Sequence, residues 1–301
     1  MEPLPTPESN PSRRRTIRLA ILGGAVVAIG GIGATALPYL QESVTPDKPT
    51  TIHHEPTPPH AEFSVQPTWQ QAFNHQSDGE LDPVVWSYNV DPAVPTYNAE
   101  EQAYTGQRRN VRIEKDALVI EAHREAYAYP NDPSGHAYDI TSGRIDTHNS
   151  FSFEYGKIEA TMKLPSGAGT WPAFWLLSAN QPYTSILHPS AADWAQKRFY
   201  MHDGELDIME AYGTNPGVVE ATAYTYNQTV SAERAVPDMS NTFHTYGLEV
   251  TPTKVTWTID GSAYYSFQKP SDNPDAWPFG HGNRFYVILN LAMGWYRWRC
   301  G

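Results

Sequence analysis

The sequence predicts an all-β fold in which many short strands form a sandwich or a barrel. Alternating or β-branched runs are short, as at 117–122, 156–164 and 254–259. Glycine, proline, asparagine or aspartate lies between these runs, as turn residues do between strands. The body contains no long amphipathic helix pattern and no internal repeat. We therefore expect a single β-domain after the N-terminal region.

The composition is that of one large domain with an appendage. The 301 residues are 40% hydrophobic and 12% aromatic, which is enough for a sizeable core. The formal net charge is −12, and an acidic protein repels the phosphate backbone of nucleic acids. We therefore expect no nucleic-acid partner, whereas a neutral polysaccharide is compatible with this charge. Cys300 is the only cysteine, which excludes an internal disulfide and leaves one site for intermolecular pairing.

Residues 1–36 have the pattern of a signal peptide or a membrane anchor. The basic stretch 12–18, which resembles a twin-arginine signal, precedes an uncharged run over 19–40. Ala34-Thr35-Ala36 is a small-x-small cleavage signal, but a run of this length also suffices to span a bilayer. Cleavage and retention both stay open. In either case we expect an exported protein, extracellular or anchored to the outer face of the cell membrane, which contacts the membrane through this segment alone.

The rest of the chain divides into a linker and a folded body. Residues 37–60 are rich in proline and threonine, which favours an extended, weakly structured linker. The body spans 61–301 and is expected to be a monomer. Within it, 178–203 is a long insertion-like stretch, and a stretch of this length is usually either functional, here as a wall of a cleft, or disordered.

The stretch 204–213 carries three carboxylates, Glu205, Asp207 and Glu210, separated by apolar residues. In an extended strand, Glu205 and Asp207 share one face and the apolar residues between them take the other. Glu210 is out of phase unless a bulge at 208–209 adds one residue. A helix would give only a poor apolar stripe here. We therefore predict a bulged strand with one acidic face and one core face.

Three negative charges on one face of a strand are unfavourable unless that face lines a wet cleft. One interpretation is a solvated strand whose carboxylates bind calcium or form salt bridges. The other is a pair of carboxyl groups that cut a glycosidic bond, a nucleophile and an acid/base roughly 5 to 5.5 Å apart. In the second interpretation Asp207 shares a proton with the nucleophile and keeps the two pKa values apart.

This acidic stretch resembles the catalytic signature of glycoside hydrolase family 16, in the bulged form of bacterial laminarinases. The resemblance implies Glu205 as nucleophile, Asp207 as its helper and Glu210 as general acid/base. It covers about residues 66–294 and implies a two-sheet β-jelly-roll sandwich with a concave substrate cleft. The other stretches that match the family in order are 98–105, 141–145, 153–177, 243–249, 257–261 and 288–292.

Five residues are candidates for substrate binding. Trp171 and Trp175 share one face of a predicted strand; such a pair alone is more typical of a core, but the resemblance places it in the groove. The resemblance also implies that Asn98 and Arg144 hydrogen-bond sugar hydroxyls on the donor side of the cleft. Tyr224 stands where many laminarinases have a histidine, which bears on substrate choice rather than on the type of reaction.

The resemblance predicts a glycoside hydrolase catalytic domain at 61–301 that performs retaining endo-hydrolysis of β-1,3-linked glucan. Its partner is then a polysaccharide, and no metal or organic cofactor enters the chemistry. A transglycosylase on the same polysaccharide class and a non-catalytic glucan-binding surface protein are the alternatives. The tail 295–301 matches nothing in the family, so we expect a truncated C-terminus and a jelly roll without its last strand. That loss would remove part of any structural calcium site.

Overall fold

The protein has the all-β fold that the sequence predicts. A computed structural model describes residues 16–22, 26–29, 63, 66–73, 79–90, 100–130, 132, 135–180 and 203–294, with side chains from residue 63 onward. No α-helix occurs among these residues, and hence none that is long and apolar enough to cross a membrane. The predicted linker at 37–60, Asn98 and the tail 295–301 lie outside the described residues.

The described residues form the following strands: β1 (Thr16–Leu22), β2 (Val26–Ile29), β3 (Trp69–Gln71), β4 (Ser87–Tyr88), β5 (Gln102–Tyr104), β6 (Val111–Glu114), β7 (Ala117–Ala128), β8 (Ala137–Ser142), β9 (Arg144–Asp146), β10 (Gly156–Lys163), β11 (Thr170–Ser178), β12 (Glu205–Ala211), β13 (Val218–Tyr224), β14 (Thr229–Ala235), β15 (His244–Val250), β16 (Lys254–Ile259), β17 (Ser262–Gln268) and β18 (Phe285–Met293).

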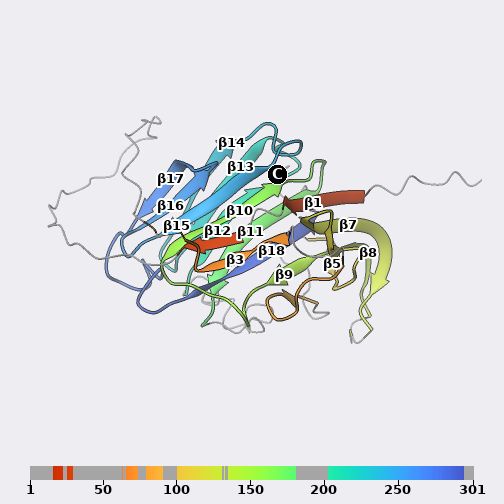
Figure 1. The fold of residues 1–301 in the computed structure, drawn as a ribbon, viewed down its shortest axis with the longest axis horizontal. Helices are drawn as coiled ribbons and strands as arrows, with labels where there is room; N and C mark the ends of the chain where they lie inside the picture. Colours follow the sequence, from red (N-terminus) through yellow and green to blue (C-terminus); the bar gives the residue numbers. More distant parts are fainter. Residues whose placement is uncertain are drawn as a thin grey trace, which may run out of the picture.

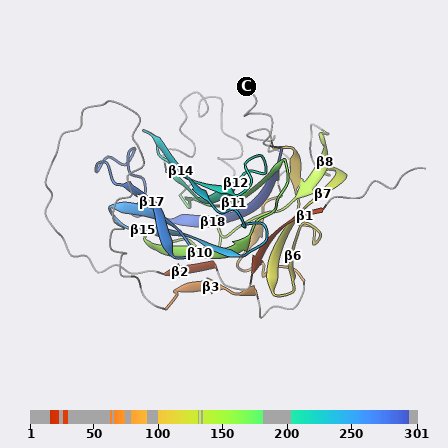
Figure 2. The same cartoon turned by 90° about the horizontal axis from the view of Figure 1, so that it is seen from above.

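These strands form two stacked sheets, which Figures 1 and 2 show from two directions. One sheet has eleven described strands in the order β17-β16-β15-β10-β1-β7-β8-β5, with β2, β3 and β6 paired beside this path. The other has seven, in the order β14-β13-β12-β11-β18-β9-β4. The two sheets build the predicted β-jelly roll. All the described strand pairs are antiparallel except β5 with β8.

The core lies between the two sheets and explains the alternation in the sequence. In β10, Ile158, Ala160 and Met162 are fully buried, while the residues between them are partly exposed. In β11 of the other sheet, Phe174 and Leu176 are fully buried in the same core. The opposite face of the seven-stranded sheet is therefore free to carry polar side chains, and this face holds the candidate site.

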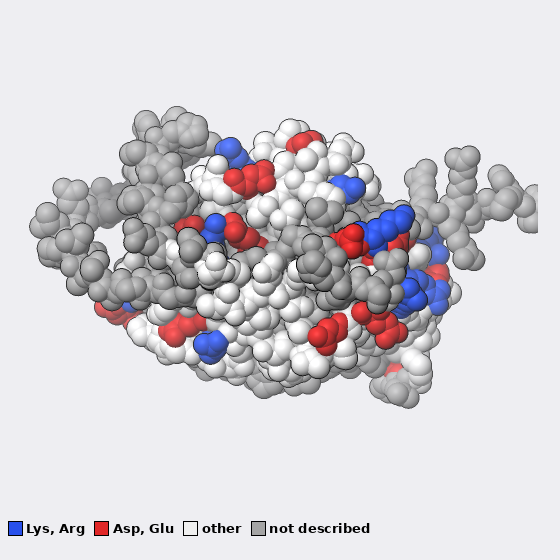
Figure 3. All heavy atoms as spheres, in the orientation of Figure 1, with Lys and Arg blue, Asp and Glu red and all other residues white. Residues whose placement is uncertain are grey.

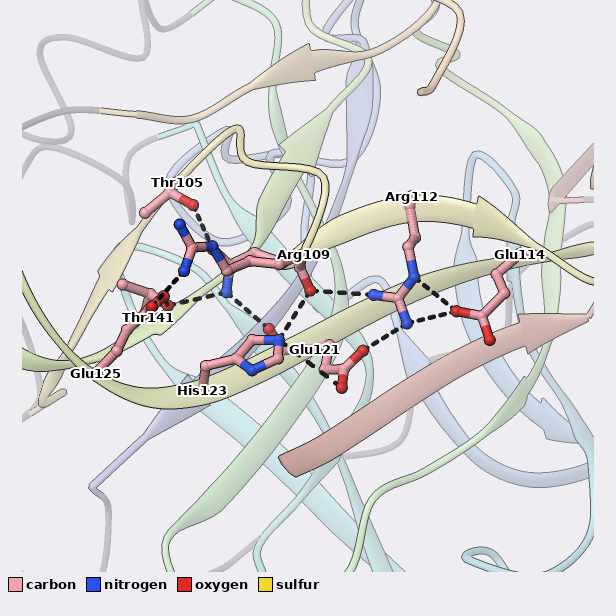
Figure 4. A network of polar contacts seen from close by, with 9 residues as sticks. Thr105, Arg109, Arg112, Glu114, Glu121, His123, Glu125 and Thr141 are labelled. Carbon is pink, nitrogen blue, oxygen red and sulfur yellow. Dashed lines mark hydrogen bonds and ion pairs between the residues drawn. The ribbon is translucent and has the colours of Figure 1, made fainter. Parts of the chain in front are cut away.

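A polar network on the outer face of the eleven-stranded sheet joins β6, β7 and β8 (Figure 4). Arg112 lies 2.6 Å from carboxylate oxygens of both Glu114 and Glu121, and Glu121 is buried. Arg109 pairs with Glu125 at 2.5 Å. A buried carboxylate needs such partners, so loss of Arg112 would leave the charge of Glu121 buried and uncompensated. It belongs to the sheet that does not carry the three acids of β12.

Strand β1 lies between β7 and β10 and pairs with both of them. Strand β2 follows it and pairs with β10 and β3. Strand β1 of the N-terminal region therefore joins β7 to β10 in the eleven-stranded sheet. The export role of residues 1–36 and the absence of a last strand stay predictions.

Candidate active site

Strand β12 carries the three acids and contains the predicted bulge. Asp207 and Glu210 are three positions apart, yet they pair with residues two positions apart on both neighbouring strands. One extra residue on β12 therefore restores the phase, so that all three acids face away from the core. The pairs are Asp207–Trp175 and Glu210–Ala173 with β11, and Asp207–Thr222 and Glu210–Glu220 with β13. The apolar residues of the strand, Leu206, Ile208, Met209 and Ala211, are buried in the core.

The opposite sheet holds the bulge in place. Trp257 of β16 is fully buried, and its indole Nε1–H donates to the backbone oxygen of Asp207 at 2.8 Å. A bulge interrupts the hydrogen-bond ladder, and a buried carbonyl group needs a partner from elsewhere. The sequence shows Trp257 only as part of a family-like stretch, and nothing in its spacing connects it to the acids.

Glu205 and Asp207 act as a hydrogen-bonded pair. Burial raises the pKa of Glu205 to about 7, while the hydrogen bond from Asp207 and the charge of Arg144 oppose the rise. Burial, followed by the charges of Glu205 and Glu210, raises the pKa of Asp207 well above its usual range. Asp207 therefore holds the proton that the pair shares, and Glu205 is left as the carboxylate. This is the arrangement that the sequence predicts for a nucleophile and its helper.

Glu210 is held as an acid by its surroundings. It is buried, and the indole Nε1–H of Trp171 donates to its Oε1 at 2.7 Å. Burial raises the pKa of Glu210 to about 8, opposed by the hydrogen bonds from Trp171 and Tyr212 and assisted by the charges of Glu205 and Glu220. Glu210 is therefore protonated at neutral pH. Trp171 thus lies on the same face of the sheet as the three acids and is hydrogen-bonded directly to Glu210.

Arg144 and Trp175 come together beside the acids. The guanidinium carbon of Arg144 lies 4.8 Å from the centroid of the Trp175 ring and 5.9 Å from that of Tyr104. Arg144 is buried. The indole Nε1–H of Trp175 donates to Oδ1 of Asn290 at 2.7 Å. A stacked guanidinium and an indole present a flat surface with hydrogen-bond donors at its edge.

A chain of polar side chains continues from this pair. Asn290 donates from Nδ2 to the hydroxyl of Tyr104 at 3.1 Å, and that hydroxyl donates to Oε2 of Glu100 at 2.9 Å. Gln102 also donates to Oε2 of Glu100, at 2.6 Å. Burial raises the pKa of Glu100, and the charge of Arg144 opposes the rise. These residues lie in the stretches 98–105 and 288–292, which resemble the family. That resemblance was the only indication in the sequence that they belong to the site.

Comparison with known proteins identifies the family of this site. The family named Glycosyl hydrolases family 16 matches residues 98–296. The chain belongs to this family. It is therefore a glycoside hydrolase, and the face of β12 that carries the three acids is its candidate active site.

The relatives of this family 16 hydrolase agree with that assignment. A beta-glucanase of Rhodothermus marinus is 36% identical over 242 residues, which cover 76% of this chain and 77% of the relative. Glucan endo-1,3-beta-glucosidase A1 of Niallia circulans is 32% identical over 75% of this chain, but only 33% of that protein is covered.

Solved structures give the same fold. A non-specific endo-beta-1,3(4)-glucanase of the family has a TM-score of 0.65 and 30% identity, over 76% of this chain and 81% of its own. The laminarinase from Rhodothermus marinus has a TM-score of 0.62 and 33% identity, over 76% of this chain and 86% of its own.

The structure describes only some of the remaining residues predicted for the site of this glycoside hydrolase. Tyr224 pairs with Glu205 across β12 and β13, so it lies on the same face of the sheet as the three acids, beside the predicted nucleophile. Asn98 and most of the insertion, 181–202, lie outside the described residues. Within the described part of the chain, no group of three or more His, Cys, Asp or Glu side chains is arranged to hold a metal ion.

Proposed function

We propose that this protein hydrolyses β-1,3-linked glucan within the polysaccharide chain and retains the configuration at the anomeric carbon. The observation that carries the proposal is the bulge in β12, which brings Glu205, Asp207 and Glu210 to one face of the sheet. The substrate class is supported by relatives named beta-glucanase and glucan endo-1,3-beta-glucosidase.

In the first step, Glu210 donates its proton to the glycosidic oxygen that leaves, and the carboxylate of Glu205 attacks the anomeric carbon. The glycosidic bond breaks and a glycosyl ester of Glu205 forms. The raised pKa of Glu210, about 8, keeps the required proton in place near neutral pH. The proton on Asp207 keeps Glu205 ionised by a hydrogen bond to its carboxylate.

In the second step, Glu210 is ionised and takes a proton from a water molecule, which attacks the anomeric carbon. The ester bond to Glu205 breaks, and a sugar with the original configuration leaves. The indole of Trp171 stabilises the ionised form of Glu210 during this step. Arg144 and Trp175 contact the sugar on the β11 side of β12, and Tyr224 contacts it on the β13 side, beside Glu205.

Glu205→Gln tests the nucleophile. The variant should fold normally and release no reducing ends from laminarin, whereas Glu233→Gln, at an exposed position on β14, should retain wild-type turnover. Retained turnover by Glu205→Gln would remove Glu205 from the nucleophile role. Proton NMR of the first products distinguishes retention, which gives the β-anomer before mutarotation, from inversion.

The substrate range is tested on laminarin, lichenan and agarose, with chromatography of the products. Cleavage of laminarin into oligosaccharides of several lengths supports endo-hydrolysis. Elongated products at high oligosaccharide concentration would assign a transglycosylase instead. Retention on laminarin in an affinity gel without any release of sugar would assign a glucan-binding protein.

We also propose that residues 1–36 direct the protein out of the cytoplasm, because a basic stretch precedes an apolar run with a cleavage signal. Fractionation of expressing cells tests export: a protein that stays in the cytoplasm contradicts it. The mass of the exported chain then decides between cleavage near residue 36 and a retained anchor.

A further inference from the structure

A single row of paired residues crosses the seven-stranded sheet through Glu210. In antiparallel sheets, residues that pair directly across strands point to the same face. The row consists of Glu233 on β14, Glu220 on β13, Glu210 on β12, Ala173 on β11, Asn290 on β18 and Arg144 on β9. Figure 1 shows the strands of this row in that order. The groove face is therefore acidic on one side of Glu210 and basic on the far side.

Glu220 is the nearest charged group to Glu210 from any neighbouring strand in this row. Paired residues on adjacent strands lie about 5 Å apart, whereas Arg144, three strands away, is about 15 Å from Glu210 between backbones. Coulomb energy falls with distance, so the anion dominates over the cation at Glu210. Val219 and Ala221, on either side of Glu220 in β13, are fully buried in the core, so Glu220 points to the opposite face of the sheet, the one that carries the three acids.

The groups around Glu210 can be named element by element among the described residues. Its own strand supplies Glu205 and Asp207; β13 supplies Glu220; β11 supplies the neutral indole of Trp171; and the turn after β12 supplies the phenol of Tyr212. The indole and the phenol donate hydrogen bonds that favour ionisation of Glu210. Glu205 and Glu220 oppose ionisation, and of these two only Glu220 takes no part in the proposed reaction.

We propose that Glu220 is a positioning residue of the hydrolytic site, one whose negative charge keeps the catalytic proton on Glu210. This inference rests on the function proposed above. Two residues of the row, Arg144 and Glu220, act on the catalytic carboxyl groups in opposite ways: Arg144 favours the ionised form of Glu205, and Glu220 favours the protonated form of Glu210. Two carboxyl groups that differ in environment can then act as base and acid at one pH.

Glu220→Gln tests this role because it removes the charge and keeps the size of the side chain. The alkaline limb of the pH profile of kcat/KM on laminarin should move to lower pH by about one unit, the size expected for a charge one strand away. The acidic limb should stay in place. Glu220→Asp keeps the charge and should return the limb toward wild type, and Glu233→Gln, farther along the same row, should leave it unmoved.

Three results would overturn the inference. One is an alkaline limb that does not move in Glu220→Gln. Another is a raised KM at every pH with an unshifted profile, which would make Glu220 a substrate contact. The third is an equal loss of kcat at every pH together with a lowered melting temperature, which would make its role structural.

A measurement without substrate separates this inference from the proposed function. In protein labelled with carboxyl-¹³C glutamate, the resonance that disappears in Glu210→Gln reports the titration of Glu210. Its pKa should be lower in Glu220→Gln than in wild type whether or not the protein cleaves laminarin. An unchanged pKa of Glu210 in Glu220→Gln would contradict the inference. A lowered pKa without any turnover would contradict only the proposed reaction.

Discussion

Trp171→Phe removes the hydrogen-bond donor of Glu210 and keeps an aromatic ring in the groove. The indole Nε1–H reaches Oε1 of Glu210 at 2.7 Å in a buried site. A hydrogen bond to a charged group contributes about 1.5 to 3 kcal/mol, and one pKa unit corresponds to about 1.4 kcal/mol. Loss of the bond destabilises the ionised carboxylate, so the pKa of Glu210 should rise from about 8 by roughly one to two units.

This rise has opposite consequences for the pH profile and for the rate. The alkaline limb of kcat/KM should move to higher pH, because Glu210 keeps its proton longer. The value of kcat should fall by about tenfold or more, because a weaker acid transfers its proton less readily and its ionised form loses a partner in the second step. Both are measured by reducing-end release from laminarin over a range of pH.

Trp175→Phe is the matched control, since Trp175 lies on the same face of β11 but donates to Asn290 rather than to an acid. We expect a raised KM and an unshifted alkaline limb. If the limb of Trp171→Phe stays in place or moves to lower pH, the hydrogen bond does not control the protonation of Glu210. The same displacement in both variants would point to a general disturbance of the groove.

Two further predictions concern stability. The pKa of Glu210 is about 8 in the folded protein and about 4.3 in an unfolded chain, so between these values only the folded state keeps the proton and stability falls as pH rises. Glu210→Gln should therefore raise the melting temperature by on the order of 5 °C at pH 8, and leave it nearly unchanged at pH 4, in calorimetry. A Cβ on Gly213 would lie 1.8 Å from the backbone oxygen of Gly167, so Gly213→Ala should destabilise the fold by about 2 kcal/mol or more in urea unfolding. Gly106→Ala, which makes only ordinary contacts, is its control. Wild-type stability of Gly213→Ala, or a pH-independent effect of Glu210→Gln, would contradict the respective argument.

The bulge in β12 was predictable because it follows from a local conflict. Glu205, Asp207 and Glu210 cannot share a face at the two-residue period of a strand unless one residue is added. Each alternative buries a charge or exposes apolar residues, and both outcomes are unfavourable. The structure resolves the conflict as the sequence predicts, with Ile208 and Met209 both buried.

The partners of the acids were less predictable, because they depend on which strands become neighbours. Trp257 reaches Asp207 from the other sheet, and Asn290 meets Tyr104 from 186 positions away. Strand order and register decide such contacts, and neither is encoded in the spacing within one segment. Glu220 is the clearest example, because its position beside Glu210 follows only from the pairing of β12 with β13.

The N-terminal region shows how one stretch of sequence can carry two patterns. Its apolar content predicts an export segment, whereas the pairing of β1 with β7 depends on alternation. Ile17, Leu19 and Ile21 are the register partners of three core residues of β7, and Arg18 is the register partner of the buried Glu121. A bilayer span requires hydrophobicity without alternation, and a strand inside a half-buried sheet requires alternation. The two patterns overlap, because the uncharged run over 19–40 contains the end of β1 and all of β2, which pair with β7 and β10. Cleavage near residue 36 would therefore remove both strands from the eleven-stranded sheet.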